Sequence, residues 1–242
     1  MNIADPGFEL REQIQLPENE VHLWRVDLAS VAPSEHKWRR ILSEDERVRA
    51  ARFRFPRDRQ NFTATRALLR TILGGYTACD PKQLLFRYSD KDKPSLSSDS
   101  GEQIEFNVSH SGLTALLAFA RGRTVGVDVE QIRNDFDHEA VARRFFSGDE
   151  QRQLAALAPS ERFIGFFRCW TRKEAYIKAV GNGLSLPLDQ FDVSLKPGDH
   201  NALIATRPNS GEAALWTLQE IPAGEGYIAA LCVHGHGWRL KS

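Results

Sequence analysis

The spacing of hydrophobic and polar residues in the first half of the chain predicts one strand, two helices and then several short strands. Alternation over 21–28 is typical of a half-buried strand. Ser43 and Glu46 have the spacing of a capping box, so a helix is expected to begin there and to be broken by Pro56. The remaining elements expected in this half are a helix over about 58–76, strands over 84–89, 104–108 and 113–120, and a polar loop over 90–101.

The second half repeats this order of elements. A strand over 124–130 is followed by helices over about 138–146, 149–158 and 160–180, and then by strands over 191–195, 213–218 and 227–233. The sequence therefore predicts an α+β fold of two similar lobes. The turn at 121–123 is the expected boundary, with an N-terminal lobe over 1–121 and a C-terminal lobe over 122–242.

Composition narrows the class of protein. The chain has 242 residues, no formal net charge, 41% hydrophobic and 26% charged residues, which is typical of a globular domain. It has no apolar run of transmembrane length and no apolar stretch near Met1, so neither a membrane span nor a secretory signal is expected. The three cysteines lack metal-site spacing and predict a reducing, cytoplasmic location.

Charge is unevenly distributed along the chain. The segment 37–70 contains eleven basic and four acidic residues, a local charge of +7, so the rest of the chain carries −7. Such a segment suggests a polyanionic partner, and a solvated arginine-rich helix face is the alternative.

Two carboxylates share one face of the strand over 124–130. Alternation places Gly126, Asp128 and Glu130 on the same side. Like charges this close repel each other, so a positive group is expected over them, and Gly126 leaves room for a close approach.

A third acid lies in the helix expected over 160–180. Glu174 falls in the middle of an apolar stripe and so needs a partner. Lys178 is one turn further along, and a structural ion pair between the two is the alternative to a functional role. Asp128, Glu130 and Glu174 together form an oxygen-only set of the kind that suits Mg²⁺.

Candidate phosphate contacts lie elsewhere in the sequence. The segment 107–112 offers two hydroxyls, His110 and a glycine between two strands, and Lys93 precedes Pro94. Gly181, Asn182 and Gly183 follow the long helix, where they would act as a C-cap or, on a much weaker signal, as a phosphate-binding loop.

Two longer motifs resemble the Sfp-type 4′-phosphopantetheinyl transferases. Gly126-Val127-Asp128-Val129-Glu130 matches the block Gly-x-Asp-x-Glu. Trp170-Thr171-Arg172-Lys173-Glu174-Ala175-Tyr176-Ile177-Lys178 matches Trp-x-x-Lys-Glu-x-x-x-Lys. The segments 52–55, 107–111 and 183–188 also resemble family blocks, in the family's order. Asp92 departs from the glycine that the family often has before Lys-Pro.

The resemblance implies a pseudo-dimer of two lobes with the active site in the cleft between them. It implies transfer of phosphopantetheine from coenzyme A to a serine of an apo acyl or peptidyl carrier protein, with release of 3′,5′-ADP. Asp128, Glu130 and Glu174 would bind Mg²⁺ (or Mn²⁺), and Lys178 would contact the phosphate and assist the leaving group. The implied contacts of coenzyme A are Arg49, Lys93, Ser109, His110, Asp128 and Lys178.

Several alternatives stay open at this point. The base for the serine is Glu174, Asp128 or a water molecule. The same acids would also suit a Mg²⁺-dependent hydrolase of nucleotide pyrophosphates, and the arginine-rich segment would suit a nucleic-acid-binding module. Of these we expect a monomeric transferase that binds neither nucleic acid nor membrane. The sequence does not identify the carrier protein or say whether acyl-coenzyme A is accepted.

Overall fold

The computed structural model describes residues 1–10, 12–89, 93–97, 103–181, 186–207 and 209–242. The chain divides into two compact units, the first comprising 1–105, 113–122 and 239–242 and the second 106–112 and 123–238. These units differ from the expected lobes, 1–121 and 122–242, in the placement of 106–112, 122 and 239–242. Each unit contains both helices and strands, and the predicted α+β class is confirmed.

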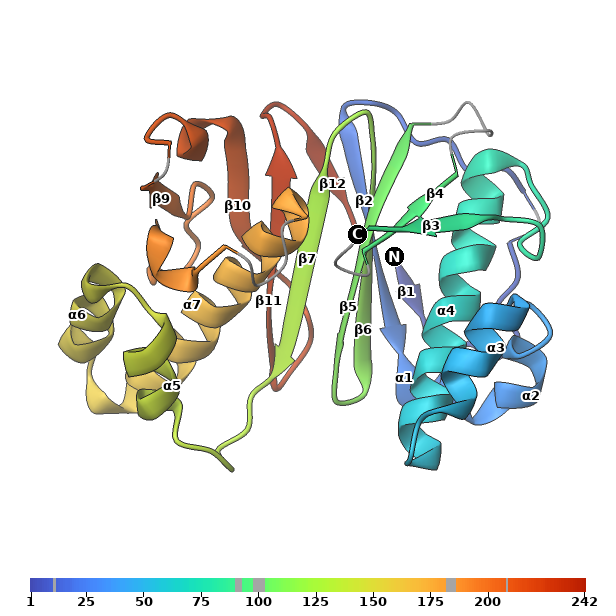
Figure 1. Cartoon of the computed structure of the whole chain (residues 1–242), viewed down its shortest axis with the longest axis horizontal. Coiled ribbons are helices and arrows are strands. Elements are labelled where there is room, and N and C mark those ends of the chain that lie inside the picture. The colour runs from blue at the N-terminus through green and yellow to red at the C-terminus, as the bar shows by residue number, and fades with distance from the viewer. Residues whose placement is uncertain (11, 90–92, 98–102, 182–185, 208) are drawn as a thin grey trace. The chain divides into compact units, whose positions relative to one another are not determined.

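The sheet of the first unit is built around β2 (Glu20–Asp27). β6 (Thr114–Arg121) pairs with it antiparallel, while β1 (Asn2–Ile3) and β12 (Arg239–Lys241) run parallel to it (Figure 1). The long helix α4 (Pro56–Thr77) contacts this sheet through Tyr76, whose ring packs on Phe119 and whose hydroxyl accepts the Trp24 Nε1–H at 3.0 Å.

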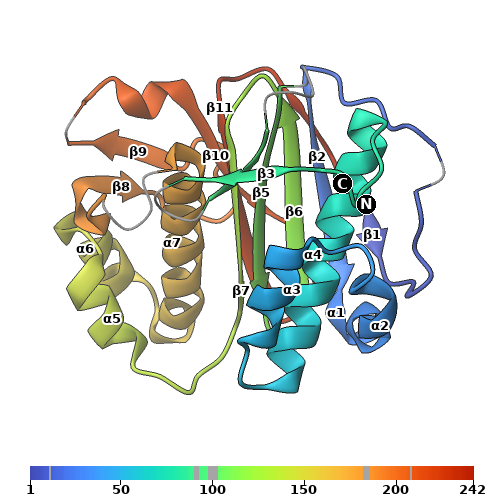
Figure 2. The same cartoon turned by 45° about the vertical axis from the view of Figure 1, so that its right-hand side comes forward.

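Shorter helices surround α4 in the first unit. α1 (Leu28–Val31), a 3₁₀ turn (Ala32–Ser34) and α2 (Glu35–Trp38) follow β2, and α3 (Glu44–Ala51) lies alongside α4 (Figure 2). β3 (Phe86–Tyr88) and β4 (Pro94–Leu96) form a small antiparallel pair.

In the second unit the sheet order is β10–β11–β7. The strands are β7 (Val125–Gln131), β10 (Trp216–Ile221) and β11 (Tyr227–His234), and all pairings are antiparallel. The long helix α7 (Pro159–Val180) packs on β7 and β11.

The other described elements of the second unit are α5 (His138–Phe145), α6 (Gly148–Ala156), a 3₁₀ turn (Leu188–Gln190), β8 (Phe191–Val193), β9 (Leu203–Thr206) and a second 3₁₀ turn (Glu212–Leu215). β5 (Ile104–Ser111) contributes Phe106–Ser111 to this unit.

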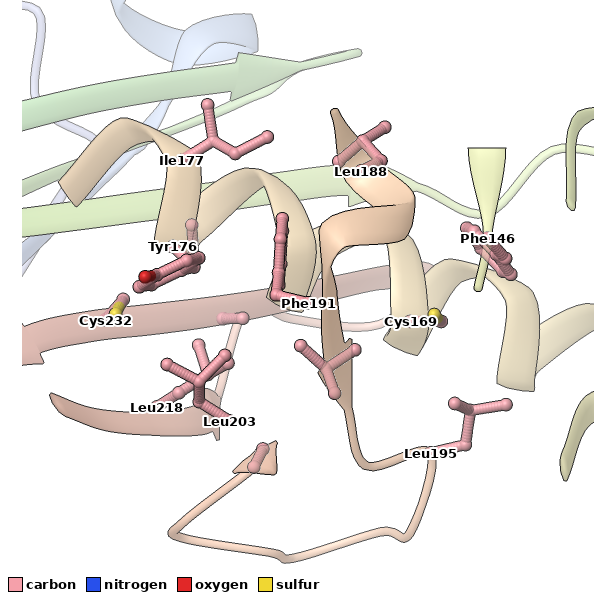
Figure 3. Close-up of a cluster of buried hydrophobic side chains, with 14 of the residues drawn as sticks. Phe146, Cys169, Tyr176, Ile177, Leu188, Phe191, Leu195, Leu203, Leu218 and Cys232 are labelled. Carbon is pink, nitrogen blue, oxygen red and sulfur yellow. The ribbon is translucent and has the colours of Figure 1, made fainter. Parts of the chain in front are cut away.

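Aromatic and aliphatic side chains fill the core beneath α7. Tyr176 contacts Phe191 and Trp216, with ring centroids 4.8 Å and 5.6 Å apart. Figure 3 shows Leu203, Leu218 and both buried cysteines in the same cluster. Burial of one stripe of α7 explains why its sequence is so rich in aromatic residues.

The two units share one local device. In each, a capping box begins a short helix, Ser43 with Glu46 in α3 and Ser147 with Glu150 in α6. Each buried glutamate also pairs with a buried cation on a 22-residue helix, Glu46 with Arg70 of α4 and Glu150 with Lys173 of α7. This correspondence supports the expectation of two similar lobes.

Several expected boundaries are corrected by the structure. Pro56 begins α4, because proline fits the first turn of a helix, whereas α3 already ends at Ala51. The expected loop over 90–101 contains β4. The expected strand over 213–218 begins at Trp216, after a 3₁₀ turn. None of the helices in the described part of the chain has the length and apolar composition that crossing a bilayer requires.

Candidate active site on β7 and α7

Close packing of α7 on β7 creates the candidate site in the second unit. A Cβ atom on Gly126 would lie 2.2 Å from Ala175 O and 2.3 Å from Ala179 N, so the backbone of the helix touches the strand at this glycine. The expected close approach at Gly126 is therefore made by α7 itself. Asp128 follows on the same face of β7, and α7 presents Glu174 and Lys178 one turn apart.

Lys178 is the positive group that the two strand carboxylates require. Its Nζ lies 2.6 Å from Asp128 Oδ1 and donates to Ser109 Oγ at 3.0 Å. Ser109 in turn donates to Asp128 Oδ1 at 2.9 Å. The Asp128 side chain is only 4% exposed and that of Lys178 is 28% exposed, so this ion pair is shielded on the carboxylate side and open on the ammonium side.

Glu130 and Glu174 are half-buried carboxyl groups whose charges are costly. Burial raises the pKa of Glu130, the charge of Asp128 raises it further, and a hydrogen bond from Ser111 at 2.8 Å partly opposes both effects. Burial also raises the pKa of Glu174, as do the charges of Asp128 and, to a smaller extent, Glu130, while Lys178 lowers it. The three acids therefore influence one another electrostatically.

The fit of a divalent cation to these acids is partial. Asp128 Oδ2 is buried and lacks a hydrogen-bond partner in the described part of the chain, which leaves one oxygen for a ligand. The available donors are oxygens, the type that Mg²⁺ prefers. However, no three His, Cys, Asp or Glu side chains of the described residues are grouped closely enough to hold a metal ion. Binding of Mg²⁺ by all three acids therefore stays a prediction.

Comparison with known proteins identifies the family. A model described as the 4′-phosphopantetheinyl transferase superfamily matches 124–232, and one described as the N-terminal part of a 4′-phosphopantetheinyl transferase matches 30–121. The chain is 39% identical over 229 residues to the 4′-phosphopantetheinyl transferase HetI of a Nostoc species. The alignment covers 94% of this chain and 93% of that protein. The chain belongs to the 4′-phosphopantetheinyl transferase superfamily.

Two transferases from Bacillus subtilis are also similar to this transferase. The 4′-phosphopantetheinyl transferase Sfp is 31% identical over 192 residues, covering 79% of this chain and 82% of its own. Another 4′-phosphopantetheinyl transferase is 30% identical over 202 residues, and the alignment covers 83% of this chain and 86% of that protein. The resemblance inferred from the motifs is thus confirmed, and the chain is an enzyme of this class.

The structure brings some of the expected site residues of the transferase together. Ser109, Asp128 and Lys178 are in direct contact, and Glu130 and Glu174 lie within electrostatic range of Asp128. His110 is exposed, on a strand whose neighbouring Ser109 is buried. Its predicted contact with coenzyme A is not tested by this arrangement.

Two further candidate contacts lie in the first unit. Arg49 is exposed on α3, with its guanidinium 5.7 Å from the centre of the Phe62 ring. Lys93 is partly exposed just before β4, and its backbone N–H donates to Ser89 Oγ. Contact of either with coenzyme A stays a prediction. Asp92 and 182–185, which include Asn182 and Gly183, lie outside the described residues, whereas Gly181 does cap α7 in the left-handed conformation.

Sequence reasoning missed the role of Lys173. This lysine is part of the motif on α7, yet it is fully buried, pairs with Glu150 at 2.7 Å and donates to Leu188 O and Phe191 O. These hydrogen bonds therefore hold α7 against the segment that leads into β8. The capping-box spacing of Ser147 and Glu150 was the available signal for Glu150, but no sequence pattern pairs Glu150 with Lys173.

Proposed function

We propose that this transferase moves the 4′-phosphopantetheine group of coenzyme A to a serine hydroxyl of an apo acyl or peptidyl carrier protein. The serine oxygen forms a bond to the phosphorus that carries pantetheine. The bond from that phosphorus to the bridging oxygen of the pyrophosphate breaks, and 3′,5′-ADP leaves with the bonding electrons. The proton of the serine passes to a base in the site.

One observation carries the assignment of residues: the Lys178 ammonium is held on the buried Asp128 carboxylate while its own side chain stays partly exposed. An ammonium fixed in this way is prepositioned to stabilise negative charge that grows on a departing phosphate. Because Lys178 is already held by a buried, hydrogen-bonded carboxylate, its side chain loses little further conformational entropy when a phosphate binds.

Glu174 is the proposed base. Without a metal its raised pKa makes it a stronger base than an ordinary carboxylate, and its half-buried side chain keeps access to solvent. Ligation of Mg²⁺ by Glu174 would compete with this role. Asp128 is less suited to this role because Lys178 and Ser109 both bond to its Oδ1. A water molecule beside Glu174 is the alternative base.

Mg²⁺ is the proposed metal. Asp128, Glu130 and Glu174 are its candidate ligands, and bound Mg²⁺ would supply neutralisation of the pyrophosphate charge. The unpartnered Asp128 Oδ2 supports this assignment. The chain's own contribution is to hold two of these carboxylates on β7 and the third on α7.

The test is incubation of the protein with coenzyme A, Mg²⁺ and a panel of apo acyl and peptidyl carrier proteins, read by intact mass. We expect one phosphopantetheine group on the carrier and one equivalent of 3′,5′-ADP. Failure to modify every carrier, with 3′,5′-ADP released in their absence, would favour the hydrolase instead. The same panel identifies the carrier and, with acyl-coenzyme A as donor, shows whether acylated donors are accepted.

A further inference from the structure

Side chains from β5 cover the edge of β7 in a regular ladder. β7 is the last strand in the order β10–β11–β7, so every second backbone N–H points away from β11 and needs an acceptor. Val127 N–H donates to Asn107 Oδ1 at 3.0 Å, Val129 N–H to Ser109 Oγ at 3.3 Å and Gln131 N–H to Ser111 Oγ at 3.0 Å. Three side chains in alternate positions of β5 thus replace a neighbouring backbone.

The two serines of the ladder also bind the candidate active-site carboxylates. Ser109 donates to Asp128 Oδ1 at 2.9 Å, and Ser111 donates to Glu130 Oε2 at 2.8 Å. Each hydroxyl therefore accepts from the amide of one residue of β7 and donates to the carboxylate of the residue before it. A hydroxyl has one proton and two lone pairs, so it can accept from the amide and still donate its proton to the carboxylate.

The chain supports this arrangement at the end of β5. Gly112 follows Ser111 with φ +56°, and a Cβ atom there would lie 2.3 Å from Gln131 Oε1 and 2.8 Å from the Tyr227 hydroxyl oxygen. The positive φ favours glycine in this turn, which passes close to the ends of the Gln131 and Tyr227 side chains. The same close approach keeps Ser111 within bonding distance of Gln131 and Glu130.

We propose that Ser111 is a positioning residue for Glu130, which it holds through the ladder as Ser109 holds Asp128. Its hydroxyl fixes which oxygen of Glu130 is engaged by the protein and so orients the carboxylate on β7. This inference rests on the proposed role of Glu130 in transfer. It assigns a function to the last hydroxyl of 107–111 that does not require contact with coenzyme A.

The first test removes the hydroxyl and restores it. In Ser111→Ala we expect the Gln131 amide proton to exchange with solvent at least about tenfold faster, while that of Val127, two rungs away, keeps its protection. Loss of a partner that orients a ligand typically costs about 10- to 100-fold in activity or metal affinity, so transfer and apparent Mg²⁺ affinity should fall by that factor. Ser111→Thr retains the hydroxyl and should recover the protection of the Gln131 amide, transfer and the apparent Mg²⁺ affinity.

Two further variants separate this inference from the proposed function. Thr217→Ala is the matched control, because it removes a strand hydroxyl that donates to Gly235 O and should leave transfer unchanged. Adding Ser111→Ala to Glu130→Gln should cause no further loss of transfer, since Ser111 acts through Glu130. Normal transfer by a folded Ser111→Ala, beside a crippled Glu130→Gln, would overturn the positioning role alone. Normal transfer by Glu130→Gln would remove the proposed role of Glu130 and this inference with it.

Discussion

Lys178 and Asp128 form an ion pair that joins α7 to β7, with Nζ and Oδ1 2.6 Å apart. The two motifs that carry the resemblance to the family therefore meet in one contact, although 50 residues separate these side chains. The sequence placed Lys178 beside Glu174 on its own helix, and the structure adds a partner on the neighbouring strand.

Lys178→Met should lower both stability and turnover. The substitution leaves a buried carboxylate without its cation, which we expect to cost about 1–3 kcal/mol in the free energy of unfolding. It should also slow the step in which charge grows on 3′,5′-ADP, so kcat falls more than the apparent affinity for Mg²⁺. Asp128→Asn in the same chain should restore stability but not turnover, as denaturant unfolding and steady-state kinetics would show. Independent, additive losses of stability would contradict a direct pair.

Glu174→Gln, unlike Lys178→Met, should lower activity without lowering stability. Because burial and the charge of Asp128 raise the pKa of Glu174, its ionised form is disfavoured in the folded, metal-free protein. Removing that charge should leave the melting temperature at neutral pH unchanged or higher. Transfer should fall by about 100- to 10,000-fold if Glu174 is the base. A lower melting temperature with normal turnover would instead indicate a purely structural carboxylate.

The sequence predicted the longer helices and strands and the motifs of this fold, because helical and strand periodicities are local properties. It could not identify β1, β4, β9 or β12, which are two to four residues long and depend on partners far along the chain. For the same reason the sequence grouped Ser109 with phosphate contacts and missed its bonds to Val129 and Asp128. Contacts between β5 and β7 depend on register, which no single segment encodes.

Gly126→Ala tests whether the close packing of α7 on β7 supports the site. The added methyl group would meet backbone atoms of Ala175 and Ala179, which cannot move independently of the helix. We expect a loss of about 1–3 kcal/mol or more in stability and a marked loss of transfer, because Glu174 and Lys178 shift with α7. Gly211→Ala is the control, since its nearest atom is 3.7 Å away and belongs to the Asn209 side chain. Equal effects of the two substitutions would argue against the packing role.

His22 should make the first unit less stable in mild acid. Its ring is fully buried, with Nδ1 2.8 Å from the Tyr76 hydroxyl oxygen, and burial lowers the pKa of His22 despite the hydrogen bond to Glu20. The unfolded chain therefore takes up a proton as pH falls below about 6.5, whereas the folded chain does not. Stability should fall from that pH downwards, by at most about 1.4 kcal/mol per pH unit for one proton. His22→Gln should flatten the dependence of the melting temperature between pH 7 and 5, and an unchanged slope would exclude His22 as its source.

Lys173 and Glu150 should behave as one unit of stability in the second half of the chain. Both side chains are fully buried, and Glu150 also accepts the backbone N–H groups of Ser147 and Val193. Lys173→Met leaves Glu150 charged in the core, which we expect to cost about 3–5 kcal/mol in the free energy of unfolding.

Glu150→Gln in the same chain should recover part of that loss, because it removes the buried charge, whereas its single amide oxygen can accept from only one of the two backbone groups, which bond to different carboxylate oxygens. Arg152→Ala is the control, because Arg152 pairs with Asp149 on the exposed side of α6 and should change stability by less than about 0.5 kcal/mol. Urea unfolding of the four proteins measures these differences. If Lys173→Met proves no more destabilising than Arg152→Ala, the buried pair does not hold α7 in place.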